Sequence, residues 1–185
     1  MGSTFAGLDP VLARILTSAV SLVLLVGAYQ KLRQWEIFRA ALANYGLLPD
    51  ALVAPTALSL PVLELIAGIA LLADPFRAAG SALSVAVLLA VTGAVAINVS
   101  RGRVDIDCGC GGLEGRQRLS WGLVARNAAL MLAAAIGAQG GAARELHWID
   151  YGTIAFGTIA LYGLYACTSQ LLANRPGLYE LRSRT

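Results

Sequence analysis

The chain has little charge, a single histidine and only three cysteines, and these shortages exclude several classes of protein. Charged residues make up 14% of the 185 positions, whereas soluble domains carry roughly 25%. Hydrophobic residues make up 57%, and the mean hydropathy is +0.68. A soluble fold of this size cannot bury so much apolar surface, so the composition predicts a membrane protein.

Three further absences narrow the architecture and the partners. No basic stripe interleaved with aromatic residues occurs, so the net charge of +3 does not indicate nucleic-acid binding. No basic stretch precedes the first apolar run, which favours a retained helix over a cleaved signal peptide. No β pattern or internal repeat stands out, so we expect one all-α transmembrane domain over residues 1–185.

The apolar runs are long enough to cross a bilayer, which takes about 20 residues per helix. The segment 31–50 instead mixes charged and aromatic residues at helical spacing, as an interfacial helix does. The sequence therefore predicts a bundle of about five transmembrane helices, with an interfacial helix after the first. The predicted spans are residues 11–30, 51–73, 79–99, 119–138 and 151–173.

Five spans assign each connection to one side of the membrane. The segment around Trp35, the polar loop 100–118 and the C-terminal tail fall on one side. The loop carries Cys108 and Cys110, and Cys167 lies near the end of the fifth span. All three cysteines are therefore predicted to lie at one membrane surface.

Cys108 and Cys110 are separated by one glycine in a charged, glycine-rich loop. Residues two apart can form a disulfide, but the small ring is strained, and strain makes a disulfide exchangeable. This pattern predicts a redox-active pair, with Cys167 as a resolving thiol. The alternative is three unpaired cysteines that act as small apolar residues, which suits Cys167 better than the pair.

Metal binding is the next alternative for these cysteines. Zinc needs a fourth ligand, and His147 is predicted to lie on the opposite side of the membrane. Asp105 or Asp107 could complete the shell, but cysteines two apart are not a usual zinc spacing. We therefore predict no metal.

Glu64 is an ionisable residue at membrane depth, where such residues mark functional sites. We expect Arg126 to be its partner in a structural ion pair or hydrogen bond; the functional alternatives are a proton route and the polar end of a quinone pocket. Trp35 and Trp121 suit an interfacial aromatic belt or the frame of that pocket. Asn127 suits a hydrogen bond between helices. The candidate quinone-binding residues are thus Glu64, Arg126, Asn127, Trp121 and Trp35.

The cysteine segment and its surroundings resemble the methylamine utilisation protein MauE family, which is grouped with DoxX-like membrane proteins. The likeness covers roughly residues 11–173 and is most specific at the cysteines. The matching residues are Asp107, Cys108, Gly109, Cys110, Gly111 and Gly112, followed by Leu119, Ser120, Trp121, Arg126 and Asn127. Earlier matches are Gly27, Lys31, Leu32, the run Tyr45 to Pro49, and Leu63, Glu64 and Leu65.

The resemblance implies a multi-pass protein of the bacterial inner membrane, embedded in lipid, that is needed to mature methylamine dehydrogenase. The small subunit of that enzyme carries many disulfides in the periplasm. The resemblance also extends to many members that look as though they occur outside methylamine metabolism. A thioredoxin-like partner, MauD, is implied as well. A bundle with cysteines at its surface is also similar, at the level of fold, to vitamin K epoxide reductase, which passes electrons to quinones.

These expectations combine into an integral-membrane thiol–disulfide oxidoreductase that exchanges with a MauD-like protein and passes electrons to a quinone. The alternatives are a non-catalytic scaffold for maturation and a reductase that carries electrons from cytosol to periplasm. The family role places the cysteine loop on the periplasmic face. Most lysines and arginines of the connections lie on that same face, and the positive-inside rule alone predicts the opposite orientation.

Overall fold

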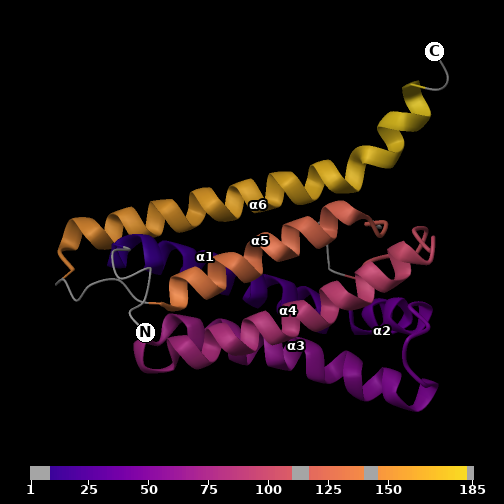
Figure 1. The fold of residues 1–185 in the computed structure, drawn as a ribbon, viewed down its shortest axis with the longest axis horizontal. Coiled ribbons are helices and arrows are strands. Elements are labelled where there is room, and N and C mark those ends of the chain that lie inside the picture. Colours follow the sequence, from indigo (N-terminus) through magenta and orange to yellow (C-terminus); the bar gives the residue numbers. More distant parts are fainter. Residues whose placement is uncertain (1–8, 110–116, 140–145, 183–185) are drawn as a thin grey trace.

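The computed structural model describes residues 9–109, 117–139 and 146–182, with side chains described as far as Asn174. These residues form helices joined by short connections, and no strand occurs among them beyond an isolated bridge between Asp107 and Arg118. Figure 1 shows the helices running side by side. They are α1 (Pro10–Arg33), α2 (Trp35–Asn44), α3 (Asp50–Leu72), η1 (Asp74–Phe76), α4 (Arg77–Ser100), α5 (Trp121–Ala138) and α6 (Trp148–Arg182).

Within the described ranges, five helical segments are long and apolar enough to span a membrane, which confirms the predicted bundle. They comprise α1, α3, η1 with α4, α5, and α6 as far as Asn174. The ten-residue α2 follows the first span as a separate helix that buries Phe38 and Ala41. The first helix ends later than predicted, because α1 continues through Lys31 to Arg33 before Gln34 interrupts it.

Local chemistry sets the helix boundaries. The carboxylate of Asp9 accepts a hydrogen bond from Val11 N–H at 2.8 Å, and Pro10 occupies the first helical position, where its missing N–H costs nothing. Gly46 has φ +61° after the end of α2. That left-handed conformation suits glycine and turns the chain toward Pro49, which caps α3.

Four of the spans, α1, α3, α4 and α5, pack as a ring of neighbours. Both α1 and α4 contact α3 and α5, so α3 and α5 are diagonally opposite. Two hydroxyl groups join neighbouring helices through carbonyl oxygens: Ser21 donates to Gly68 at 2.7 Å, and Ser81 donates to Ala134 at 2.8 Å. Such bonds stabilise helix packing in lipid, where water cannot satisfy polar groups.

The long helix α6 lies outside this ring. It packs against α1, and its spanning segment has no buried residue. Figure 1 shows α6 running along the bundle and continuing past its end, in yellow. Gly157 allows close approach to α1, because a Cβ there would lie 2.8 Å from the side chain of Ile15.

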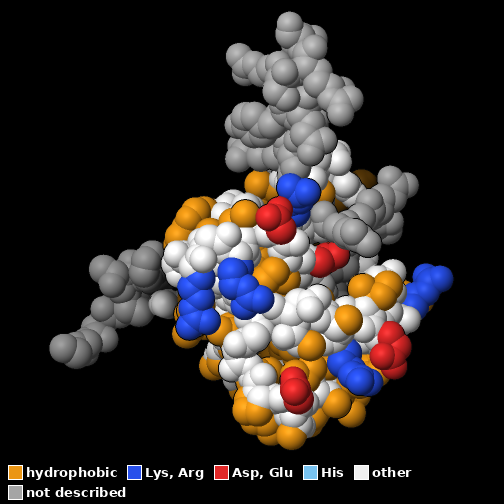
Figure 2. Space-filling view, turned by 90° about the vertical axis from the view of Figure 1, so that its right-hand side faces the viewer, with side chains coloured by type: hydrophobic (Ala, Val, Ile, Leu, Met, Phe, Trp, Pro, Cys, Tyr) orange, Lys and Arg blue, Asp and Glu red, His pale blue; other side chains and the backbone are white. Residues whose placement is uncertain are grey.

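The end of the bundle that carries Cys108 is polar. Figure 2 faces this end and shows acidic and basic side chains spread over it among hydrophobic ones. Arg39 lies near Glu36, and Arg118 lies 3.4 Å from Asp105. Charges at the helix ends and apolar residues along the sides are what a bilayer requires of a spanning bundle.

Candidate functional site

The segment around Cys108 is fixed to the end of the bundle by its own backbone. Cys108 N–H donates to the carbonyl of Gln117 at 2.8 Å, and Leu119 N–H donates to the carbonyl of Ile106 at 3.3 Å. These bonds join the two chain segments that flank residues 110–116. Those residues, which include the predicted site residue Cys110, lie outside the described residues. The flanks of the cysteine loop therefore have a defined position.

Cys108 is disulfide-bonded and only 4% exposed. It packs in an apolar cluster with Tyr45, Val95, Leu119 and Leu123. The Tyr45 hydroxyl donates a hydrogen bond to the Cys108 carbonyl at 3.2 Å. Burial, and secondly the negative charge of Asp107, raise the pKa of Tyr45, so this hydroxyl stays protonated as a donor.

Gly109 brings the loop into contact with α2. Its φ is +66°, which favours glycine, and a Cβ there would lie 3.0 Å from the Cβ of Ala41 and 3.2 Å from the Phe38 ring. Its N–H donates to the carboxylate of Asp107 at 3.1 Å. Glycine at this position therefore has a packing reason as well as a conformational one.

Arg103 ties the same region together, and sequence reasoning assigned it no role. Its guanidinium donates to the carbonyls of Asn44 at 2.9 Å and Tyr45 at 3.1 Å, and lies 3.4 Å from the Asn98 side-chain oxygen. These carbonyls end α2, so the arginine closes a helix terminus that has no further helical donors. It thereby fixes α2 against the end of α4.

The predicted pairing of Glu64 with Arg126 is wrong, because Glu64 pairs with Lys31. The Lys31 ammonium donates to both carboxylate oxygens of Glu64, at 2.5 and 2.6 Å, and both side chains are buried. The reason is geometric: α3 and α5 are diagonal in the bundle, whereas α1 packs directly on α3. Because α1 extends past Gln30, Lys31 belongs to this helix and faces α3.

Arg126 instead joins α5 to α6. It donates to the Ser169 hydroxyl at 3.1 Å, and its guanidinium lies 5.1 Å from the centre of the Tyr165 ring. The neighbouring Asn127 amide donates to the Thr92 hydroxyl at 3.1 Å, which joins α5 to α4. Both residues therefore make the contacts between helices that polar residues make within membranes.

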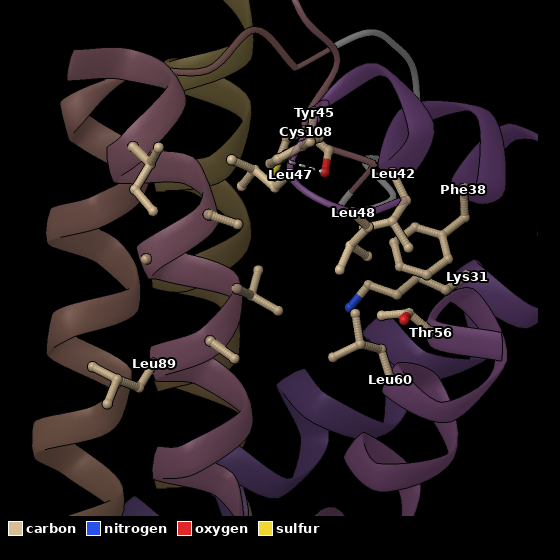
Figure 3. Close-up of a pocket in the computed structure, with 15 residues that line it drawn as sticks. Lys31, Phe38, Leu42, Tyr45, Leu47, Leu48, Thr56, Leu60, Leu89 and Cys108 are labelled. Carbon is tan, nitrogen blue, oxygen red and sulfur yellow. Dashed lines mark hydrogen bonds between the residues drawn. The ribbon is translucent and has the colours of Figure 1, made fainter. Parts of the chain in front are cut away.

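An apolar cavity of about 390 Å³ lies between α3 and α4 at the Cys108 end of the bundle. Figure 3 shows the Lys31 nitrogen pointing into this space, and Cys108 at its edge beside Tyr45. The volume lies within the range of small-molecule sites, roughly 300–1,000 Å³. The remaining lining residues are Phe38, Leu42, Leu47, Leu48, Thr56, Leu60, Leu89, Ala90, Val91, Gly93, Ala94 and Ile97.

The predicted quinone-binding residues are not the ones that line this cavity. Glu64 reaches it only through Lys31, while Arg126 and Asn127 lie among α4, α5 and α6. Trp121 is 59% exposed and Trp35 is half-buried, as membrane anchors are. One sequence signal could have identified Lys31: it is a lone lysine that directly follows a long apolar run. If the helix of that run continues past Gln30, Lys31 lies on it.

Cys167 is free and exposed on α6. Two residues later, the Ser169 carbonyl accepts a hydrogen bond from the Gln117 side chain at 3.3 Å, which places this part of α6 at the Cys108 end of the bundle. Cys167 does not line the cavity. In the described part of the chain, no three His, Cys, Asp or Glu residues are grouped so that they could hold a metal ion.

Comparison with known proteins finds one family consistently. The family model described as Methylamine utilisation protein MauE matches residues 9–140. Methylamine utilization protein MauE of Methylophilus methylotrophus is 45% identical over 102 residues, which span 55% of this chain and 54% of that protein. The Methylorubrum extorquens protein of the same name is 44% identical over 128 residues, or 68% of each chain.

A third relative extends the match over most of both proteins. Methylamine utilization protein MauE of Paracoccus denitrificans is 35% identical over 162 residues, which span 86% of this chain and 87% of that protein. No solved structure matches the chain.

Proposed function

Because the chain belongs to the methylamine utilisation protein MauE family, we propose that it is an integral-membrane thiol–disulfide oxidoreductase of that system. Cys108 and Cys110 form its redox pair, and a quinone takes up the electrons. The observation that carries the proposal is the state and place of Cys108, which is disulfide-bonded, buried and in the wall of an apolar cavity.

In the proposed exchange, a thiolate of a thioredoxin-like, MauD-like partner attacks the disulfide and forms a mixed disulfide. The partner's second thiolate then releases the mixed disulfide. The partner leaves oxidised, and Cys108 and Cys110 remain as thiols. The oxidised partner forms disulfides in the small subunit of methylamine dehydrogenase or a similar periplasmic client.

The burial of Cys108 assigns different tasks to the two cysteines in this proposal. A protein thiol cannot reach the sulfur of a residue that is only 4% exposed and packs against Tyr45, Leu119 and Leu123. The partner therefore attacks Cys110, and Cys108 faces the cavity. The cysteine end of the bundle accordingly lies on the periplasmic side of the bacterial inner membrane, where disulfides persist.

The first prediction concerns the two cysteines directly. Cys108→Ser and Cys110→Ser should each abolish exchange with the partner, because either change leaves no disulfide in the loop. When a mild thiol oxidant such as diamide removes the two electrons, only Cys108→Ser should form a mixed disulfide with a partner whose second cysteine is also replaced, because it keeps the accessible thiol. Cys167→Ser is the matched control, and loss of exchange in it would assign Cys167 the predicted resolving role.

Labelling of the thiols in intact cells with a membrane-impermeant maleimide completes this test. We expect Cys110 to react after mild reduction, and Cys108 to react only after the protein is unfolded. Normal client maturation in both single variants contradicts the proposal. Labelling of Cys110 only in broken cells contradicts the periplasmic orientation.

A further inference from the structure

We infer that the cavity between α3 and α4 binds the headgroup of a membrane quinone, with the Lys31 ammonium donating a hydrogen bond to one of its carbonyl oxygens. The inference rests on the proposed function, because it takes Cys108 and Cys110 to cycle between disulfide and dithiol. It adds a site, a position for the ligand and a residue that binds it.

The lining of the cavity suits a flat, largely apolar ring with polar atoms at its edge. Leucines from α2, α3, α4 and the connection between α2 and α3 form part of a mostly apolar wall. Its polar or reactive members are Lys31, Tyr45, Thr56 and Cys108. An apolar site with a few well-placed polar groups is typical of small-molecule binding. A water-soluble metabolite would leave its polar groups without partners on these walls.

The cavity is open to the lipid-facing surface of the bundle. Leu89 and Ile97 of α4 line it, and they are 61% and 42% exposed. Both belong to a helix that spans the membrane, so their exposed faces meet lipid chains. A ligand dissolved in the bilayer can therefore enter sideways, and its isoprenoid tail can remain among the lipid chains.

Lys31 has a donor to spare for such a ligand. An ammonium group carries three N–H donors, and Glu64 accepts two of them. In the described part of the chain the structure gives the third no oxygen or nitrogen acceptor, only the Phe38 ring, whose centre lies 5.7 Å from the nitrogen. Figure 3 shows the nitrogen pointing into the cavity. The Glu64 carboxylate orients the Lys31 ammonium at membrane depth, so the donor is in place before a ligand arrives.

The redox step balances between the cysteine pair and a quinone held in this way. The two thiols lose two electrons and two protons; their S–H bonds break and the S–S bond forms. The same two electrons and two protons pass to the carbonyl oxygens of the ligand, where two O–H bonds form, and the product is the hydroquinone. Lys31 stabilises the negative charge that develops on the nearer oxygen as the electrons arrive.

A lipid acyl chain is the alternative occupant, and the polar groups argue against it. An acyl chain cannot accept a hydrogen bond, so the ammonium would face hydrocarbon with an unused donor. A disulfide-bonded cysteine in the wall also serves no purpose for a lipid. A quinone makes use of both groups.

The test uses the full-length protein in nanodiscs of quinone-free lipid and an azido-substituted short-chain ubiquinone as the probe. Illumination should label the cavity-lining parts of α3 and α4, and unlabelled decylubiquinone should compete. Gly93→Phe should lower labelling about tenfold or more, because Gly93 lines the cavity and a side chain there enters open space. Gly163→Phe is the matched control: its site is equally open, lies on α6, and should label like the wild type.

The contribution of Lys31 is tested with Lys31→Met/Glu64→Gln, which removes both charges and leaves no unpaired carboxylate. A hydrogen bond to a charged donor is worth about 1.5–3 kcal/mol, so labelling should fall about tenfold to a hundredfold. Glu64→Gln alone removes the carboxylate that orients Lys31 but keeps the amine, so labelling should fall by less than in the double variant. Thermal unfolding of each variant in the same nanodiscs confirms that the protein is folded.

Three outcomes overturn the inference: Gly93→Phe labels like the wild type, labelling falls outside the cavity, or a photoreactive phospholipid labels the cavity and quinone does not compete. These outcomes are distinct from failure of the proposed function. If the partner still exchanges with Cys110 while quinone labelling is absent, the exchange function stands and the quinone site is wrong. If Cys108→Ser and Cys110→Ser still support maturation, the proposed function fails whatever the labelling shows.

Discussion

Lys31 and Glu64 place two opposite charges inside an apolar bundle, and both side chains are buried. In such surroundings each charge needs the other, because neither can be solvated by water. The pair also joins α1 to α3 and aims the ammonium at the cavity. One interaction between two residues therefore serves the packing of the bundle and the chemistry of the site.

We predict that Lys31→Met destabilises the bundle by about 3–5 kcal/mol, because it leaves the Glu64 carboxylate buried without a partner. The double variant Lys31→Met/Glu64→Gln should recover most of that loss. The measurement is unfolding of the protein in mixed micelles by a denaturing detergent. Equal stability of the single and double variants would show that the unpaired charge is not the cause.

Tyr45 gives a pH dependence whose sign follows from its surroundings. Burial and the nearby Asp107 charge raise the pKa of Tyr45 in the folded protein, while an unfolded tyrosine titrates near 10. Above about pH 10 the unfolded state therefore loses a proton that the folded state keeps, and this group lowers stability as pH rises.

We predict that Tyr45→Phe has a flatter stability profile above about pH 10 than the wild type, although it loses the hydrogen bond to Cys108. Alkaline absorbance titration should show the same tyrosinate signal for the two folded proteins up to about pH 10. A smaller tyrosinate signal in Tyr45→Phe than in the wild type over that range would mean that Tyr45 ionises in the folded protein.

At the scale of elements, the cysteine loop and α2 form one unit. Gly109 touches Ala41 and Phe38, Tyr45 bonds to Cys108, and Arg103 caps the end of α2. Cys108 lines the cavity from the loop, and Phe38 and Leu42 line it from α2. Any movement of α2 changes both the cover of Cys108 and the shape of the cavity.

Gly109→Ala should loosen this unit. Alanine in a left-handed conformation costs about 1–2 kcal/mol, and its methyl group would press on Ala41 at 3.0 Å. We expect a water-soluble phosphine to reduce the disulfide about 5–30 times faster than in the wild type. Gly102→Ala is the matched control, because φ is +75° there but the space is open. Equal rates for the two variants would mean that contact with α2 does not protect the disulfide.

At the scale of the whole molecule, the helices were predictable and their mutual arrangement was not. Long apolar runs define spans because a bilayer tolerates little else. The partner of Glu64 depended on which helices are neighbours and on whether α1 continues past Gln30. The cavity depended on where α3 and α4 separate, which hydropathy does not encode. Cys108 was found from its chemistry, but its burial required the fold.

The charges at the cysteine end also have structural roles. Lys31 is buried against Glu64, Arg103 binds backbone carbonyls, and Arg118 lies beside Asp105. The positive-inside rule counts such cations without regard to their partners. Cations that the fold itself requires are therefore a weaker guide to orientation than the raw count implies.

The length of α6 has a consequence for the surroundings of the disulfide. Its 35 residues, at about 1.5 Å each, reach about 52 Å, whereas the hydrocarbon core of a bilayer is about 30 Å thick. The excess continues past the end of the bundle on the Cys108 side, as Figure 1 shows. The end of α6 therefore projects from the membrane surface beside the disulfide. A partner protein that binds there must avoid this helix, which restricts the directions from which it can approach.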